Sequence, residues 1–294
     1  MTLHFNHWWL AIRPKTLLAS IGPILLGTAL ACSETTINYA LFFSALLCAM
    51  SLQISVNLAN DLFDSLSGVD TKHRLGPTRA VQSGLISLAA IKVGLAIVCM
   101  VALLSGLYLI ALGGWWVFLL GILSFTGVFA YSAGPFPLAS HALGEVTVLI
   151  FFGWVAVLGS YYLQTGTISW LAFGIATSAG LYSSAIMLIN NIRDISTDRH
   201  AKKYTLAVVL GDHKARYLLA ILIVAALIIH ALIAMQTLAI LWLTFILIIT
   251  PSYYVISKGF KLQGQALNQL LADTAKVGFL YCFFVALSWL YLSL

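Results

Sequence analysis

Apolar stretches long enough to cross a lipid bilayer follow one another along almost the whole 294-residue chain. A helix needs about 20 apolar residues to cross the hydrocarbon core, and an unbroken helix satisfies its own backbone there. Hydrophobic residues make up 61% of the chain and charged residues 8%, whereas soluble domains carry about 25% charged residues. We therefore expect an all-α, polytopic membrane bundle that forms a single domain over residues 1–294. Nine transmembrane helices are predicted, at roughly 16–33, 38–57, 88–110, 112–131, 141–163, 169–190, 216–235, 238–256 and 273–293.

The distribution of basic residues supports this number of spans. With nine spans, all 15 Lys and Arg residues fall on the N-terminal side of the membrane, and the opposite loops carry none. Because basic loops remain in the cytoplasm, the N-terminus is predicted to face the cytoplasm and the C-terminus to face outward. The net charge of +6 then reflects membrane topology and anion binding, with no indication of nucleic acid.

Two acidic clusters stand where long apolar runs end. The first is the segment 57–64, NLANDLFD, with Asp70 just beyond it, and the second is the segment 190–198, NNIRDISTD. Only nine residues of the chain are Asp or Glu, and five of these are the aspartates of the two clusters. Carboxylates crowded at a membrane boundary repel one another unless a cation joins them. A divalent metal is therefore expected between the clusters.

Helical spacing places the members of each cluster on one stripe: Asn57, Asp61 and Asp64 in the first, and Asn191, Asp194 and Asp198 in the second. Two such helix ends facing each other would offer the hard oxygen ligands that Mg²⁺ prefers, and Mg²⁺ completes its shell with water and substrate phosphate. Basic residues that can bind phosphate accompany both clusters: Arg74 and Arg79 after the first, and Arg193, Arg199, Lys202 and Lys203 around the second. Together these groups predict a diphosphate site. The alternative is a solvated interfacial loop whose charges pair with each other or with lipid headgroups.

The location of this site suggests its chemistry. A diphosphate bound above apolar helices belongs to a lipid whose tail lies among them. If that lipid is an allylic prenyl diphosphate, metal and basic groups stabilise the departing diphosphate. The remaining carbocation needs a dry pocket with aromatic faces. The aromatic residues available for this role are Tyr131, Phe125, Phe129, Phe151, Phe152 and Trp154.

In these motifs the chain resembles the UbiA-type intramembrane prenyltransferase superfamily. The pairing of Asn60-Asp61-x-x-Asp64 with Asp194-x-x-x-Asp198 carries that resemblance. Within the superfamily the chain is most similar to the branch that prenylates 1,4-dihydroxy-2-naphthoate in menaquinone biosynthesis. Segments that match this branch are Arg13-Pro14-Lys15-Thr16-Leu17, Gly68-x-Asp70, Arg74-Leu75-Gly76-Pro77-Thr78-Arg79-Ala80-Val81, Tyr131-Ser132-Ala133-Gly134-Pro135, Leu143-Gly144-Glu145, Phe151-Phe152-Gly153-Trp154, Asn190-Asn191-Ile192-Arg193-Asp194 and Thr205-Leu206-Ala207-Val208 with Leu210-Gly211.

The resemblance implies a UbiA-type fold in a bacterial cytoplasmic membrane, with the active site facing the cytoplasm. It implies transfer of a polyprenyl group from a polyprenyl diphosphate to 1,4-dihydroxy-2-naphthoate, with loss of diphosphate and CO₂, to give demethylmenaquinone. Mg²⁺–diphosphate would be held by Asp61, Asp64, Asp70, Asp194 and Asp198, supported by Asn60 and Asn191. Diphosphate oxygens would be met by Arg74, Arg79 and Lys203.

Two departures from the family pattern leave roles open. The interval from Asp64 to Asp70 is longer than in 4-hydroxybenzoate relatives, which fits the naphthoate branch but leaves the role of Asp70 undecided. Lys202 stands where relatives of this branch often have Gly, so either Lys202 or Lys203 could meet phosphate.

Three further residues have two interpretations each. Arg13 and Lys15 would bind the naphthoate carboxylate or a phosphate, or would serve only as a cytoplasmic anchor. Glu145 lies a few residues inside a predicted span, where an acidic side chain is costly. It would bind a naphthol hydroxyl or accept a proton, or it would extend to the interface.

Other functions compete with this prediction. The same fold could prenylate 4-hydroxybenzoate or homogentisate, or could use a phytyl donor. A cation-coupled transporter would place its acidic residues near mid-membrane with access to both faces. A non-catalytic lipid-binding scaffold is the third alternative.

Overall fold

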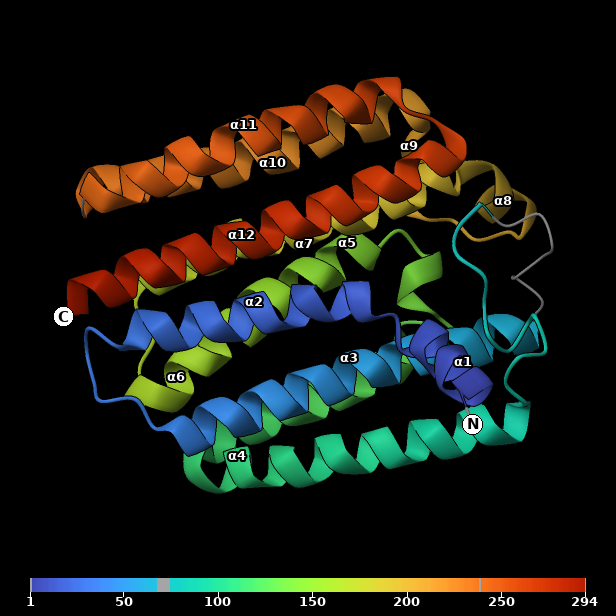
Figure 1. Ribbon diagram of the computed structural model, residues 1–294, viewed down its shortest axis with the longest axis horizontal. Helices are drawn as coiled ribbons and strands as arrows, with labels where there is room; N and C mark the ends of the chain where they lie inside the picture. The colour runs from blue at the N-terminus through green and yellow to red at the C-terminus, as the bar shows by residue number, and fades with distance from the viewer. Residues whose placement is uncertain (1, 68–74, 238, 294) are drawn as a thin grey trace.

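The computed structural model describes residues 2–67, 75–237 and 239–293 (Figure 1). The predicted all-α fold is confirmed: these residues form helices, and their only β-type contact is an isolated bridge between His141 and Tyr204. The long helices are apolar runs with polar residues at their ends. Ser87 and Ser169, for example, accept backbone N–H bonds from Ala90 and Ala172 as N-caps. The helices are α1 (Thr2–Ile12), α2 (Pro14–Ala31), α3 (Tyr39–Ser67), α4 (Leu88–Ala130), α5 (Gly144–Val148), α6 (Gly159–Thr165), α7 (Trp170–Arg193), α8 (Ile195–His200), α9 (Leu206–Leu210), α10 (Asp212–Gln236), α11 (Ala239–Lys261) and α12 (Leu267–Ser293), with short 3₁₀ turns η1 (Leu138–Ser140) and η3 (Gly264–Ala266) and a π-helical stretch η2 (Leu149–Leu158).

Several of these helices are long and apolar enough to cross a membrane. Within the described residues there are seven, or eight if the bent pair Asn6–Ile12 and Thr16–Ala31 counts as one span. The predicted number of nine is not reproduced as nine separate helices. One reason is that the predicted spans 88–110 and 112–131 are the two arms of α4.

Helix α4 folds back on itself at Gly114. The backbone there has φ 71° and ψ −156°, which a residue with a Cβ rarely adopts. Leu95 of the first arm and Val128 of the second belong to the same buried apolar cluster. In a straight helix these two residues would be about 50 Å apart. The reversal therefore brings both arms of α4 against α3 (Figure 1).

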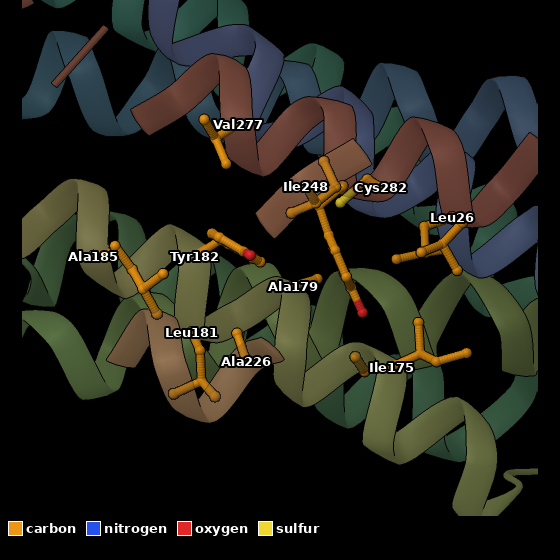
Figure 2. Packing of buried hydrophobic residues seen from close by; sticks show 14 of the residues in the cluster. Leu26, Ile175, Ala179, Leu181, Tyr182, Ala185, Ala226, Ile248, Val277 and Cys282 are labelled. Atoms are coloured by element: carbon orange, nitrogen blue, oxygen red, sulfur yellow. The ribbon is translucent and has the colours of Figure 1, made fainter. Parts of the chain in front are cut away.

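Helix α7 is the central helix of the bundle, and most of its residues are buried. It packs against α2, α10, α12 and η2. Figure 2 shows part of this core, in which Ile175, Ala179 and Tyr182 of α7 meet Leu26 of α2 and Cys282 of α12. A second apolar cluster joins α3 to both ends of α4.

The contact between α7 and η2 depends on two glycines. A Cβ atom on Gly153 would lie 2.7 Å from the carbonyl oxygen of Ala176, and one on Gly180 would lie 2.8 Å from that of Leu149. Small residues allow membrane helices to pack backbone to backbone in this way. Because α3 and α7 end at the same end of the bundle, where α8 also lies (Figure 1), their acidic clusters are brought to one level.

Candidate active site

Both acidic clusters border one cavity of about 840 Å³. Its polar end is lined by Asn60, Asp64, Arg79, Asn190, Asn191, Asp194, Asp198 and Lys203, with Arg13 and Thr16 beside them. The rest of its wall is mainly apolar and comes from α2, α3, α7, α12, the two arms of α4 and the α5–η2–α6 segment. The predicted convergence of the clusters is therefore present in the structure. Their position at one end of the bundle does not match the mid-membrane site that a cation-coupled transporter would need.

In the first cluster, Asp64 and Asp61 point in different directions. Asp64 lines the cavity, and its Oδ2 accepts a bond from Arg79 Nη2 at 3.1 Å. Asp61 lies outside the lining and is 1% exposed, and its Oδ2 accepts the N–H of Ala80 at 3.1 Å. Asp61 thus fastens the turn that presents Arg79 to Asp64. Its predicted role as a metal ligand stays a prediction.

The asparagines of the first cluster connect α3 to its neighbours. Asn60 Oδ1 accepts a bond from Ser132 Oγ at 2.8 Å, just after α4 ends. Asn57 Nδ2 donates to the carbonyl of Ile12 at 2.8 Å and to Thr16 Oγ1 at 2.9 Å. These bonds hold the junction of α1 and α2.

The junction itself places one predicted basic residue at the cavity. Arg13 has a left-handed backbone (φ 54°, ψ 70°) and lines the polar end. Lys15 lies in the first turn of α2, and its side chain is outside the described part of the structure. Asp70 and Arg74 also fall outside the described residues, so their predicted roles stay predictions.

In the second cluster, the break between α7 and α8 sets the geometry. The backbone at Asp194 has φ −98° and ψ 9°, and the N–H of Asp198 bonds its carbonyl at 2.8 Å. Both carboxylates consequently line the same side of the cavity, one turn apart.

Each of these two carboxylates has a cationic partner. Arg193 holds Asp194 through two bonds, Nε to Oδ1 at 2.8 Å and Nη2 to Oδ2 at 2.5 Å. Lys203 Nζ lies 3.9 Å from Asp198 Oδ1. Lys203 also lines the cavity, whereas Lys202 lies outside that lining. The placement favours Lys203 as the residue that meets phosphate.

Glu145 is buried inside the bundle. It is 4% exposed at the start of α5, and its Oε1 accepts a bond from Asn191 Nδ2 at 2.8 Å. Its backbone carbonyl accepts a bond from Ser184 Oγ at 2.7 Å. Asn191 lines the cavity while Glu145 stands behind it. The carboxylate is therefore connected to the cavity through Asn191.

The apolar part of the cavity contains four of the six predicted aromatic residues, Tyr131, Phe125, Phe151 and Phe152. Phe129 and Trp154 lie outside the lining; Trp154 instead bonds Thr177 Oγ1 at 3.1 Å. The Tyr131 hydroxyl lies 3.3 Å from Met187 Sδ.

One residue of the polar network was not predicted as a site residue. This is Asn268, at the start of α12, which accepts a bond from Arg193 Nη1 at 2.7 Å and is marked by no local pattern. Arg193 itself was predicted among the basic residues of the diphosphate site. Its side chain is 2% exposed, lies outside the cavity lining and pairs with Asp194.

The donors at the polar end suit Mg²⁺ bound together with a phosphate-bearing ligand. Among the described residues, no group of three or more Asp, Glu, His or Cys side chains forms a preformed metal cage. Mg²⁺ is usually bound by one or two carboxylates, with water and substrate phosphates completing its shell. Asp64, Asp194 and Asp198, with nearby amide oxygens, supply hard oxygen donors of this kind. These residues fit a Mg²⁺–diphosphate complex.

Comparison with known proteins finds one matching family and several similar sequences. The UbiA prenyltransferase family matches residues 20–280. The chain is 39% identical over 250 residues to the 1,4-dihydroxy-2-naphthoate octaprenyltransferase of Escherichia coli (strain K12), covering 83% of this chain and 81% of that protein. It is 32% identical over 282 residues to the protein of the same name from Bacillus subtilis (strain 168), covering 95% and 90%.

Solved structures share the fold. A UbiA homologue from Archaeoglobus fulgidus bound to GPP and Mg²⁺ superposes with a TM-score of 0.72 at 16% identity, covering 97% of this chain and 99% of that one. The apo structure of a UbiA homologue from Aeropyrum pernix K1 gives a TM-score of 0.70 at 16% identity, covering 95% and 98%. With its all-helical fold and several membrane-spanning helices, the chain belongs to the UbiA prenyltransferase family.

Proposed function

We propose that this protein transfers a polyprenyl group from an allylic polyprenyl diphosphate to 1,4-dihydroxy-2-naphthoate, giving demethylmenaquinol, the reduced form of demethylmenaquinone. The observation that carries the proposal is the cavity, whose charged end joins both acidic clusters and whose remaining wall is mainly apolar. The names of the relatives from Escherichia coli and Bacillus subtilis support the choice of acceptor. The one-sided distribution of Lys and Arg supports an orientation with the active site facing the cytoplasm, and the bacterial relatives support a bacterial cytoplasmic membrane.

The diphosphate is bound at the polar end of the cavity. Asp64, Asp194 and Asp198 would hold Mg²⁺ there, with Asp61 and Asp70 as further predicted ligands. The metal would neutralise charge on the leaving group. Arg79 and Lys203, which pair with Asp64 and Asp198, also lie within reach of an anion in the cavity. Their guanidinium and ammonium groups can donate to diphosphate oxygens as negative charge develops on them.

The prenyl tail occupies the apolar part of the cavity. As the C1–O bond of the donor breaks, its electron pair goes to diphosphate and an allylic cation remains. Phe125, Phe151, Phe152 and Tyr131 offer aromatic faces to that cation, and the apolar wall excludes water that would capture it.

The acceptor reacts through the ring carbon that carries its carboxylate. This carbon forms the new bond to C1 of the donor, and loss of the carboxylate as CO₂ returns an electron pair to the ring. Arg13, which lines the polar end, would bind the acceptor carboxylate beforehand. Asn191, held by Glu145, can bond a naphthol hydroxyl.

Reconstitution of the purified protein tests this function. The protein is mixed with Mg²⁺, a prenyl diphosphate and, separately, 1,4-dihydroxy-2-naphthoate, 4-hydroxybenzoate or homogentisate, and the products are identified by mass. We expect a decarboxylated prenyl product from the naphthoate alone, and none after EDTA treatment until Mg²⁺ is restored. Asp64→Asn and Asp194→Asn should each lower turnover by about 10²-fold or more.

Asp212→Asn serves as the matched control, because Asp212 pairs with Arg216 outside the cavity lining. Prenylation of 4-hydroxybenzoate or homogentisate in place of the naphthoate would refute the acceptor. Full turnover in both cluster variants would refute the diphosphate site.

A further inference from the structure

The two acidic clusters are connected through α12 by hydrogen bonds and a short stretch of backbone. At its centre is Asn268, the second residue of that helix, which is half-buried. Its amide is used at both ends: Oδ1 accepts from Arg193 Nη1 at 2.7 Å, and Nδ2 donates to the carbonyl of Leu75 at 3.0 Å. One side chain thus joins segments that are 75 and 193 residues away in sequence.

Toward the second cluster, Asn268 fixes the guanidinium of Arg193. The guanidinium donates to Asp194 through Nε and Nη2 and to Asn268 through Nη1. Its Nη2 also donates to Asn190 Oδ1 at 2.9 Å. With its planar fork held on three sides, Arg193 sets the direction in which the Asp194 carboxylate faces the cavity.

Toward the first cluster, Asn268 holds the segment that leads to Arg79. Leu75 is only four residues before Arg79, so this segment spans at most about 14 Å. Arg79 donates to Asp64, and the following N–H, of Ala80, donates to Asp61. A displacement of Leu75 is therefore transmitted to the basic residue that faces Asp64.

We propose that Asn268 is a positioning residue that couples the two acidic clusters, so that both present their carboxylates to one diphosphate complex. The inference rests on the proposed function only in naming diphosphate as the anion. An amide is suited to this position because it supplies an acceptor to Arg193 and a donor to Leu75 at once. Outer partners of this kind typically contribute 10–100-fold to metal affinity or activity.

Variants at position 268 separate the two contacts. Asn268→Leu removes both, whereas Asn268→Asp keeps an acceptor for Arg193 and removes the donor to Leu75. Gln265→Ala is the matched control, an exposed amide on the preceding turn η3. Thermal unfolding of every variant shows whether the fold is retained, and Asn268→Ser replaces Asn268→Leu if the latter fails to fold.

Three measurements read out the coupling. The first is the affinity for Mg²⁺ with inorganic pyrophosphate, by calorimetry in detergent. The second is the rate of trypsin cleavage after Arg79, a residue whose side chain is 6% exposed. The third is the division of the kinetic effect between KM for the prenyl diphosphate and kcat.

We expect Asn268→Leu to weaken Mg²⁺–pyrophosphate binding by about 10–100-fold. It should also speed cleavage after Arg79 and raise KM for the donor more than it lowers kcat. Asn268→Asp should speed cleavage as much as Asn268→Leu does, and Gln265→Ala should change none of the three. Unchanged affinity and unchanged cleavage in a folded Asn268→Leu or Asn268→Ser variant would overturn the inference.

Failure of this inference is distinguishable from failure of the proposed function. Pyrophosphate binding and trypsin cleavage need no aromatic acceptor. A wild-type protein that binds Mg²⁺–pyrophosphate but prenylates no acceptor refutes the proposed function, and the variants still decide whether Asn268 couples the clusters.

Discussion

Replacing Gly153 by alanine should separate two neighbouring helices that both contribute to the cavity wall. The new Cβ would lie 2.7 Å from the carbonyl oxygen of Ala176 and 2.9 Å from Cα of Gly180, closer than such atoms pack. Both neighbours are backbone atoms of α7, so no side chain can rotate away. Overpacking of this kind costs about 1–3 kcal/mol. The clash also bears on function, because α7 leads to Asn191 and Asp194 while η2 carries Phe151 and Phe152.

Gly159→Ala is the matched control, six residues further along the same continuous helix. A Cβ there meets nothing within 4 Å, and alanine is favoured over glycine in a helix by about 0.5–1 kcal/mol. Because both variants gain this propensity term, they should differ in stability by the cost of the clash, about 1–3 kcal/mol. At about 2–4 °C per kcal/mol, their unfolding midpoints should differ by at least about 2 °C.

Thermal unfolding in one detergent, followed by tryptophan fluorescence, measures this difference. Gly153→Ala should unfold below the wild type, and Gly159→Ala at or slightly above it. Equal midpoints for the two variants, or a lower midpoint for Gly159→Ala, would show that α7 and η2 are not packed backbone to backbone.

Two further predictions concern the cavity. Gly106→Leu and Gly159→Leu should lower kcat/KM for long prenyl diphosphates more than for short ones. Both glycines line the cavity; a Cβ on Gly159 would meet nothing within 4 Å, and one on Gly106 only Cys48 Sγ at 3.7 Å. Ala111→Leu, exposed on the same arm of α4 as Gly106, is the control, and equal losses for all donor lengths would contradict the prediction. Glu145→Gln should keep kcat/KM within about threefold of the wild type, because the amide oxygen of Gln can still accept from Asn191. Glu145→Leu removes this acceptor and should lower kcat/KM by about tenfold or more. Similar losses in both variants would instead assign the carboxylate a role in proton transfer.

Much of the site could be predicted because membrane helices constrain one another strongly. Two long apolar runs that end in acidic residues on the same side of the membrane must bring those residues to one level. Helical spacing then identifies Asp64, Asp194 and Asp198, which line the cavity. The same spacing grouped Asp61 with Asp64, but three residues of helix turn the side chain by about 60°. Asp61 accordingly faces the Ala80 turn.

The remaining features depend on contacts that no local pattern encodes. Helical periodicity shows which residues share a face but not which helix that face meets. The bonds of Asn268 to Arg193 and Leu75 cross most of the chain, and they exist only because α12 begins beside the end of α7. The predicted boundary between the spans 88–110 and 112–131 lies three residues before the reversal at Gly114, whose backbone angles no local pattern fixes.

The pairing of each cavity carboxylate with its own base has a consequence for the order of events. Asp64 with Arg79, Asp194 with Arg193 and Asp198 with Lys203 carry no net charge as pairs. Because the charges cancel within each of these three pairs, the pairs attract neither a bare cation nor a bare anion strongly. A Mg²⁺–prenyl diphosphate complex offers both charges, so its metal can meet the carboxylates while its phosphates meet the basic residues. The metal and the lipid are therefore expected to bind as one complex. After the reaction, diphosphate can leave with the metal, and the original pairs form again.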